Sequence, residues 1–181
     1  MARRNTEANR LAADALEIVP GSRVLDIGCG PGVGVRIAAD RAGTGQAAGA
    51  DPSAVMVRQA RRRLRGTGCV VVQAPAERLP FPDHSFDGVS AVNSAGHWES
   101  LDAGLREVRR VLVPGGHLVL VLRLHDANAG RASRAAYGLR PERLERLRAS
   151  MRAAGFEIVS EARREVDGEQ ALALRASAPQ A

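Results

Sequence analysis

The chain has 181 residues, of which 45% are hydrophobic and 25% charged, a balance typical of one globular domain and unlike that of a disordered chain. Its net charge is +6 and all 26 basic residues are arginine, which we attribute to genomic base composition rather than to a nucleic-acid-binding surface. The longest strongly apolar run, residues 118–122, is far below the roughly 18 residues of a membrane span, and the polar residues 1–10 predict no secretory signal, so we expect a cytoplasmic protein.

Hydrophobic periodicity divides the chain into alternating helices and strands. In the first part it predicts helices over residues 6–19, 33–42 and 53–65, and strands over residues 23–27, 46–51 and 69–73. A proline-rich loop over 74–84 then precedes a strand over 86–92, a helix capped by Ser100, and a strand over 117–124 that follows the helix stop Pro114-Gly115-Gly116. The last part predicts a helix from Pro141 to Gly155 and two strands, 156–165 and 169–176, joined by a turn at Asp167-Gly168.

This order of elements predicts the fold class. Strands that alternate with helices of about 10–15 residues indicate a parallel sheet with helices on both faces. The last two strands are too close together for a crossover helix, so we expect them to pair antiparallel. The predicted fold is therefore α/β: a three-layer α-β-α sandwich with a seven-stranded, mostly parallel sheet and an antiparallel C-terminal hairpin. Residues 1–181 form a single domain in this prediction.

The turn after the first predicted strand carries the strongest chemical signal. It reads Val24-Leu25-Asp26-Ile27-Gly28-Cys29-Gly30-Pro31-Gly32, and its glycines let a ligand approach the backbone closely. Val33 replaces the third glycine of the dinucleotide fingerprint, and no Gly-Lys-Ser/Thr ending of a phosphate-binding loop follows. Asp26 and, about 20 residues later, Asp51 place carboxylates at two strand ends, which suits an ammonium group and a ribose diol. A plain strand–turn–helix, with Asp51 as a helix cap, is the alternative.

Four segments, in order and at the right intervals, resemble the class I S-adenosylmethionine-dependent methyltransferases, in the small-molecule branch similar to ubiquinone and menaquinone biosynthesis methyltransferases. These segments are Val24–Gly32, Gly49–Ser53, Ala76–Asp87 and Arg109–Leu118. The resemblance implies a transferase of class EC 2.1.1.- that moves a methyl group by in-line displacement. It also implies a covering helix over residues 1–20, a cofactor-binding core over 21–124, and an acceptor-side loop, helix and terminal strands over 125–181.

The resemblance implies S-adenosylmethionine as the cofactor and S-adenosylhomocysteine as its product. It places the turn after the first predicted strand, here called the ligand loop (Gly28, Cys29 and Gly30), along the methionine part of the cofactor. Asp26 would lie near the amino group of the cofactor, and Asp51 would bind its ribose hydroxyls. The remaining cofactor-binding residues that it implies are Pro52, Met56, Ala76 and Glu77 at the adenine and Asn93 at the amino-acid end. Family members often carry an Asp where this chain has Pro75, so the adenine contact of that Asp is missing here.

The sequence assigns no catalytic residue. Candidate residues for binding the methyl acceptor are identified only by their positions in the chain. His97 and Trp98 follow Asn93 closely, so we expect them at the mouth of the site. His97 is the candidate general base, with a loop-bonding role as the alternative, and Trp98 either lines the acceptor pocket or anchors the loop. His125 and Tyr137 follow the fifth predicted strand, where the family often builds its acceptor site. We expect an acceptor side that is either open or completed by a second subunit, in a homodimer, or by the N-terminal segment.

Methylation of a small molecule is the leading hypothesis for function. An RNA or protein methyltransferase is one alternative, and a non-catalytic module that binds S-adenosylmethionine or a partner is another. We expect the Arg61-Arg62-Arg63 cluster to be a solvated helix face, so no nucleic-acid partner is expected. No metal is expected either, because Cys29, Cys69 and the four histidines lack the spacing of metal ligands.

Overall fold

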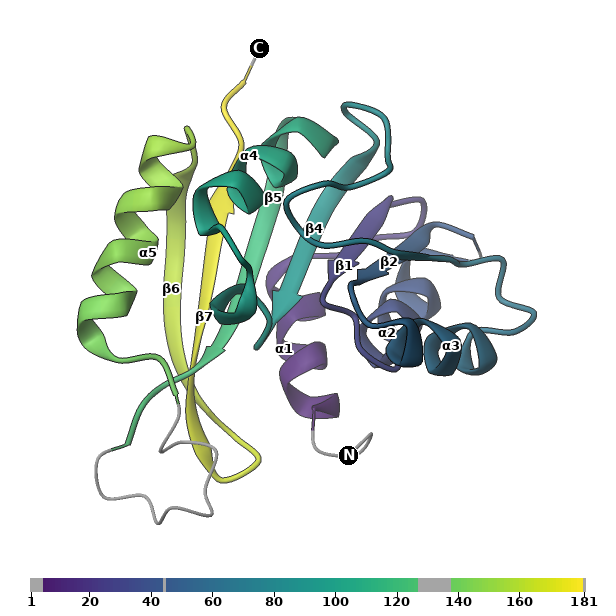
Figure 1. Ribbon diagram of the computed structural model, residues 1–181, viewed down its shortest axis with the longest axis horizontal. Coiled ribbons are helices and arrows are strands. Elements are labelled where there is room, and N and C mark those ends of the chain that lie inside the picture. Colours follow the sequence, from purple (N-terminus) through teal and green to yellow (C-terminus); the bar gives the residue numbers. More distant parts are fainter. Residues whose placement is uncertain (1–4, 44, 127–137, 181) are drawn as a thin grey trace.

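The sheet of the computed structural model, which describes residues 5–43, 45–126 and 138–180, has seven strands in the order β3-β2-β1-β4-β5-β7-β6 (Figure 1). Strands β1 to β5 pair in parallel, and β7 pairs antiparallel with both β5 and β6. This arrangement confirms the predicted fold class. The strands are β1 (Val24–Ile27), β2 (Ala47–Asp51), β3 (Val70–Gln73), β4 (Phe86–Val92), β5 (Leu112–Arg123), β6 (Glu157–Val166) and β7 (Glu169–Ser177).

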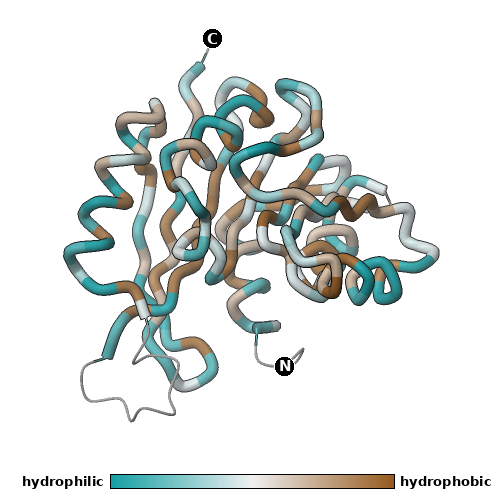
Figure 2. Tube along the Cα trace, in the orientation of Figure 1, coloured by the Kyte–Doolittle hydropathy of each residue, from teal (hydrophilic) through white to brown (hydrophobic). Residues whose placement is uncertain are grey.

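Helices cover both faces of the sheet. Helices α1, α2 and α3 contribute to one apolar core, and α4 and α5 contribute to a second core on the opposite face. The central strands are therefore buried on both sides. Figure 2 shows hydrophobic colours along them, whereas α5 and the end of α3 are largely hydrophilic. The helices are α1 (Thr6–Ala15), α2 (Val33–Ala42), α3 (Ala54–Arg63), α4 (Leu101–Val111) and α5 (Pro141–Ala153), with a short 3₁₀ turn, η1, over Ala95–His97.

Two predicted boundaries are wrong. Helix α1 ends at Ala15 and not at residue 19, because the left-handed backbone of Glu17 (φ 54°) cannot continue a right-handed helix. The Glu17 carboxylate pairs with Arg175 on β7. Strand β5 begins at Leu112, so the segment Pro114–Gly116 lies inside the strand and does not precede it. Leu112 pairs with Phe86 of β4, and the next paired residue of β5, His117, pairs with Gly88. Residues 113–116 of β5 therefore lie opposite a single residue of β4 and form a bulge.

The C-terminal hairpin has the predicted turn. Asp167 and Gly168 both have positive φ, 53° and 76°, as a two-residue turn of the favoured hand requires. Strand β6 is the outer strand of this hairpin. Within the described residues, no helix combines the length and the apolar character needed to cross a membrane. In the same part of the chain, no group of three or more His, Cys, Asp or Glu side chains is placed to hold a metal ion.

Candidate functional site

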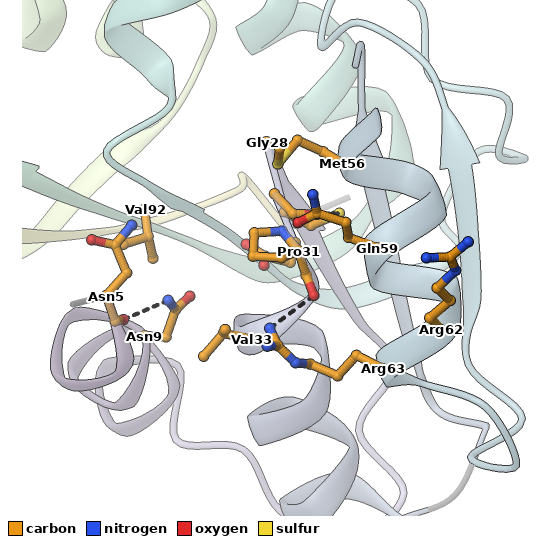
Figure 3. A pocket seen from close by; sticks show the side chains of 13 residues that line it. Asn5, Asn9, Gly28, Pro31, Val33, Met56, Gln59, Arg62, Arg63 and Val92 are labelled. Carbon is orange, nitrogen blue, oxygen red and sulfur yellow. Dashed lines mark hydrogen bonds between the residues drawn. The ribbon is translucent and has the colours of Figure 1, made fainter. Parts of the chain in front are cut away.

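The loops after β1, β2, β3 and β4 meet at one edge of the sheet and line two adjoining cavities. The first has a volume of about 590 Å³ and lies between the Gly28–Pro31 loop, the start of α1 and one side of α3 (Figure 3). The second, of about 430 Å³, lies between the loops after β2, β3 and β4. Asn5, Gly28 and Val92 line both cavities, so the two are continuous around the Gly28 backbone. Ligands of open parallel sheets bind at this edge.

The glycine loop bends sharply over the end of β2. The backbone N–H groups of Gly28 and Cys29 both donate to the Ala50 carbonyl, at 2.8 and 3.1 Å. A Cβ at Gly28, where φ is 70°, would stand 2.3 Å from the Cβ of Ser94, so the site requires glycine. A Cβ at Gly30 would meet no atom within 4 Å, so the backbone there faces open space. This loop therefore exposes the Gly30 backbone to a ligand while its Gly28 end is held against β4.

Asp26 provides a buried carboxylate beside the first cavity. Its side chain is 2% exposed and accepts a hydrogen bond from the Ser90 hydroxyl at 3.1 Å, and burial raises the pKa of this carboxyl to about 7. A Cβ at Gly34 would stand 2.4 Å from Oδ2 of Asp26 and 2.5 Å from Oδ1 of Asn9, so these two oxygens converge on one point. The Asn9 amide nitrogen donates to the Asn5 carbonyl at 2.6 Å, which fixes the orientation of Asn9 (Figure 3).

This pair of oxygens fits a cationic group. A buried carboxylate with a raised pKa lacks the solvation that its ionised form needs, and an ammonium group supplies it. Asn9 lines the same cavity, and its amide oxygen is a second hydrogen-bond acceptor there. The first cavity therefore offers acceptor oxygens of the kind that an ammonium group binds, which is the chemistry expected for the amino end of the predicted cofactor.

The Asp51 carboxylate accepts two backbone hydrogen bonds and also lines the second cavity. Its Oδ2 accepts from the Gly30 N–H at 2.8 Å and its Oδ1 accepts from the Ser53 N–H at 2.9 Å, while the helix N-cap itself is Ser53, whose hydroxyl accepts from Met56. Asp51 is therefore not the N-cap of α3, and the alternative that it acts only as a helix cap is wrong. Each carboxylate oxygen keeps a further lone pair, and the residue lines the second cavity. The two backbone bonds hold the carboxylate in one orientation, as the binding of a diol would need.

The loop after β3 forms the opposite wall of the second cavity. Pro75, Ala76 and Glu77 line it together with Pro52. Among the described residues the Ala76 N–H has no acceptor, which leaves it available to a ligand. Glu77 is partly committed, because its Oε1 accepts from the Ser100 N–H at 3.0 Å. Pro75 contributes neither a carboxylate nor an N–H at this wall.

Two residues of α4 hold this loop in place. Oε2 of Glu107 accepts from the Leu79 N–H at 2.7 Å. The Arg110 guanidinium bonds the Glu107 carboxylate and also donates to the carbonyls of Leu79 and Phe81, at 2.9 and 2.8 Å. The wall that carries Ala76 is therefore anchored to a helix and is not a free loop.

The end of β4 presents the remaining predicted residues. Asn93 has a left-handed backbone (φ 53°) and lines the second cavity, but its Oδ1 accepts from the Arg123 N–H at 2.9 Å and so joins β4 to β5. His97 is exposed and Trp98 is half-buried, and both line the second cavity. The Trp98 ring packs on Gly104 of α4, where a Cβ would stand 2.4 Å from Cε3.

The structure divides the predicted cofactor-binding residues between the two cavities. Gly28 lines both. The first cavity also contains Asp26, Cys29, Gly30 and Met56, and the second contains Asp51, Pro52, Ala76, Glu77 and Asn93. Burial raises the pKa of the Cys29 thiol far above its ordinary value, so this residue remains a protonated, small side chain. His125 lines neither cavity, and its N–H donates to the Leu139 carbonyl at 3.0 Å. Tyr137 lies outside the described residues.

Several residues of the first cavity were not predicted from the sequence. These are Asn5, Asn9 and Val33, together with Gln59, Arg62 and Arg63 from α3. Figure 3 shows the α1 and α3 side chains on opposite sides of Pro31, whose carbonyl accepts from Arg63 at 2.9 Å. Arg61, Arg62 and Arg63 are all exposed, as expected of a solvated helix face, although the Arg61 guanidinium also donates twice to the Val71 carbonyl.

Comparison with known proteins finds a matching family and several relatives. The sequence model of the family described as "Methyltransferase domain" matches residues 25–120. A Bacillus subtilis protein named as an uncharacterized methyltransferase, YdaC, is 29% identical over 157 residues, which cover 87% of this chain and 83% of that protein. The ubiquinone/menaquinone biosynthesis C-methyltransferase UbiE of Bordetella avium is 42% identical over 105 residues, 56% of this chain. The chain spans only 41% of that relative.

Solved structures share the fold across nearly the whole chain. The [4+2]-cyclase SpnF superposes on this chain with a TM-score of 0.80 and is 26% identical to it; the aligned residues cover 97% of this chain and 82% of the SpnF chain. A SAM-dependent methyltransferase from Aquifex aeolicus superposes with a TM-score of 0.78 at 18% identity, covering 97% and 92% of the two chains. The second similarity concerns the fold alone, and the first shows that this fold also occurs in a protein named for a different reaction.

Proposed function

Because this chain belongs to the class I S-adenosylmethionine-dependent methyltransferases, we propose that its methyl acceptor is a small molecule. When bound, S-adenosylmethionine supplies a methyl group already activated by the sulfonium sulfur. The protein then has to bind and align the reactants, which alone can account for much of the rate acceleration. The question of function is therefore which acceptor the chain can bind next to its cofactor site.

We assign the cofactor-binding residues from the donor and acceptor groups at the two cavities. Asp26, with Asn9 beside it, would hold the ammonium of the methionine part, and the Gly28–Gly30 backbone would line that part. Asp51 would accept from the ribose hydroxyls, since its two backbone bonds already orient it. The walls that remain for the adenine are Pro52, Met56, Ala76 and Glu77.

The observation that carries the small-molecule proposal is the shape of the space beyond the second cavity. His97 and Asn93 also line a small connecting cavity of about 130 Å³, which adjoins a third of about 330 Å³. The third cavity is walled mainly by apolar side chains, and its size falls within the range that is typical of sites for small ligands. The relative from Bordetella avium, whose name states a role in ubiquinone and menaquinone biosynthesis, supports the same choice.

The test is direct measurement of methyl transfer. The protein is incubated with S-adenosylmethionine labelled in its methyl group and with separate panels of small carboxylic acids, phenols and amines, bulk RNA, and protein. We expect label in a small-molecule panel, and about ten- to a hundredfold less of it at subsaturating S-adenosylmethionine when Asp51→Ala replaces the wild type. Label in RNA or protein alone would overturn the proposal. Binding of S-adenosylhomocysteine without any transfer would instead support the non-catalytic alternative.

The expectation of a homodimer stays a prediction. Its motivation is that His97 and the third cavity both lie at the surface, so a second copy of the chain could complete the acceptor side. Light scattering with and without S-adenosylhomocysteine measures the oligomeric state, and a monomer under both conditions would contradict the expectation.

A further inference from the structure

The third cavity lies beyond Trp98, between the start of α4, η1 and α5. Its apolar wall consists of Ala95, Trp98, Leu101, Leu122, Leu139 and Leu147. The connecting cavity shares Gly96, Leu122, Leu139 and Arg143 with it and shares Asn93 and His97 with the second cavity. The connecting cavity therefore adjoins both the candidate cofactor site and an apolar pocket of about 330 Å³.

Two arginines stand at the rim of this pocket. Arg143 and Arg146 are exposed on α5 and line the third cavity, and Arg143 also lines the connecting cavity. Within the part of the chain that the structure describes, neither guanidinium has an ion-pair or hydrogen-bond partner. Arg148 on the same helix differs, because it pairs with Glu145 and Glu161.

The charge of the pocket is positive on balance. Asp102, in the first turn of α4, is the one carboxylate among the lining residues, against two guanidinium groups. Its position at a helix N-terminus already places it in a favourable field, so it does not need an arginine partner. Unpaired guanidinium groups next to an apolar wall bind carboxylate groups well, because the planar fork matches the two oxygens.

We infer that the acceptor is an apolar small molecule with one carboxylate group, which Arg143 and Arg146 bind while its apolar part fills the third cavity. This inference rests on the proposed function, since it names the class of acceptor that the enzyme would take. It assigns to α5 the selection of the acceptor, in addition to its packing role on the sheet.

The test uses binding, so that it does not depend on turnover. Trp98 is the single tryptophan of the chain and lines both the second and the third cavity, so its fluorescence reports on ligands in either. Octanoate and 4-phenylbutyrate are titrated into the protein with and without saturating S-adenosylhomocysteine, and octanamide and 4-phenylbutyramide serve as uncharged controls. We expect the carboxylates to bind about tenfold more tightly than the amides, and this preference to weaken with added salt.

Matched variants locate the charge. Arg143→Gln with Arg146→Gln should remove the preference for carboxylates, whereas Arg152→Gln, the same change at an exposed position of α5 that lines none of these cavities, should retain it. All three proteins should bind S-adenosylhomocysteine equally. Equal binding of acids and amides, no binding of either, or an unchanged preference in the double variant would overturn the inference. Failure of the proposed function is a separate result, namely no methyl transfer to any small molecule despite a carboxylate preference.

Discussion

Replacement of Asp26 by asparagine should strengthen the fold and abolish cofactor binding. The side-chain oxygen of the new amide can still accept from Ser90, and its nitrogen gains an acceptor in Asn9, whose side-chain oxygen converges on the same point. The change removes a negative charge that the folded protein buries at 2% exposure. It also removes the anionic partner that we assign to the ammonium group of the ligand.

The magnitude follows from the pKa. Burial raises the pKa of Asp26 from 3.8 to about 7, so the ionised form costs the folded state up to about 4 kcal/mol, at about 1.4 kcal/mol for each pH unit. Because the folded-state value is the higher one, the contribution of this group to stability is complete below about pH 4 and is lost as the pH rises toward 7. The free energy of unfolding of the wild type should therefore fall by about 2–3 kcal/mol relative to the variant between pH 5 and pH 8.

Urea denaturation of the wild type and the variant at the two pH values measures this difference. The pH-dependent contributions of the other carboxylates to the free energy of unfolding cancel, because both proteins contain them. Calorimetry with S-adenosylhomocysteine measures the functional effect, and wild-type affinity should itself decline below about pH 7, as protonation neutralises Asp26. Parallel pH dependence of the two proteins would refute the assignment of a raised pKa. Undiminished binding by the variant would refute the role of Asp26 at the ammonium group.

Other changes test the remaining parts of the site. Asp51→Ala should weaken S-adenosylhomocysteine binding about ten- to a hundredfold in calorimetry, from the loss of charge-assisted bonds to the ribose. Gly34→Ala should weaken it at least about tenfold, since the new Cβ would stand 2.4 Å from the Asp26 carboxylate, and normal affinity would contradict that geometry. Glu107→Ala should lower the free energy of unfolding by about 1–3 kcal/mol in urea, because it leaves the Leu79 N–H unpaired. If His97 is the general base, His97→Ala should reduce kcat about a hundredfold with an acidic acceptor and leave cofactor affinity unchanged; a smaller loss would assign it the loop-bonding role, and normal turnover would exclude it as the base.

The predictions that succeeded depend on local chemistry. The residue ranges of α2 and β4 match the structure, and Ser100 caps α4 through a bond from Ala103, because glycine turns, N-caps and apolar periods act over a few residues. The ligand loop was identified for the same reason, since its glycines are needed by the local turn and by the close approach of β4.

The predictions that failed, and the residues that were missed, depend on distant contacts. Helix α1 stops before Glu17, whose backbone is left-handed and whose carboxylate pairs with Arg175 on β7. Asn9 gives no signal in the sequence, as its importance arises only when α1 docks next to Asp26. The arginines of α5 are similar: Arg143 joins the site only because a helix that follows β5 packs against the start of α4.

The position of Trp98 has a consequence for the energetics of binding. One indole ring forms part of the wall of two adjoining cavities and is supported from behind by the backbone of Gly104. A ligand that shifts the ring in one cavity changes the shape of the other, so the two binding equilibria share a free energy of coupling. By thermodynamic linkage that coupling has the same size in both directions: whatever factor the bound cofactor applies to the affinity for the acceptor, the acceptor applies to the affinity for the cofactor.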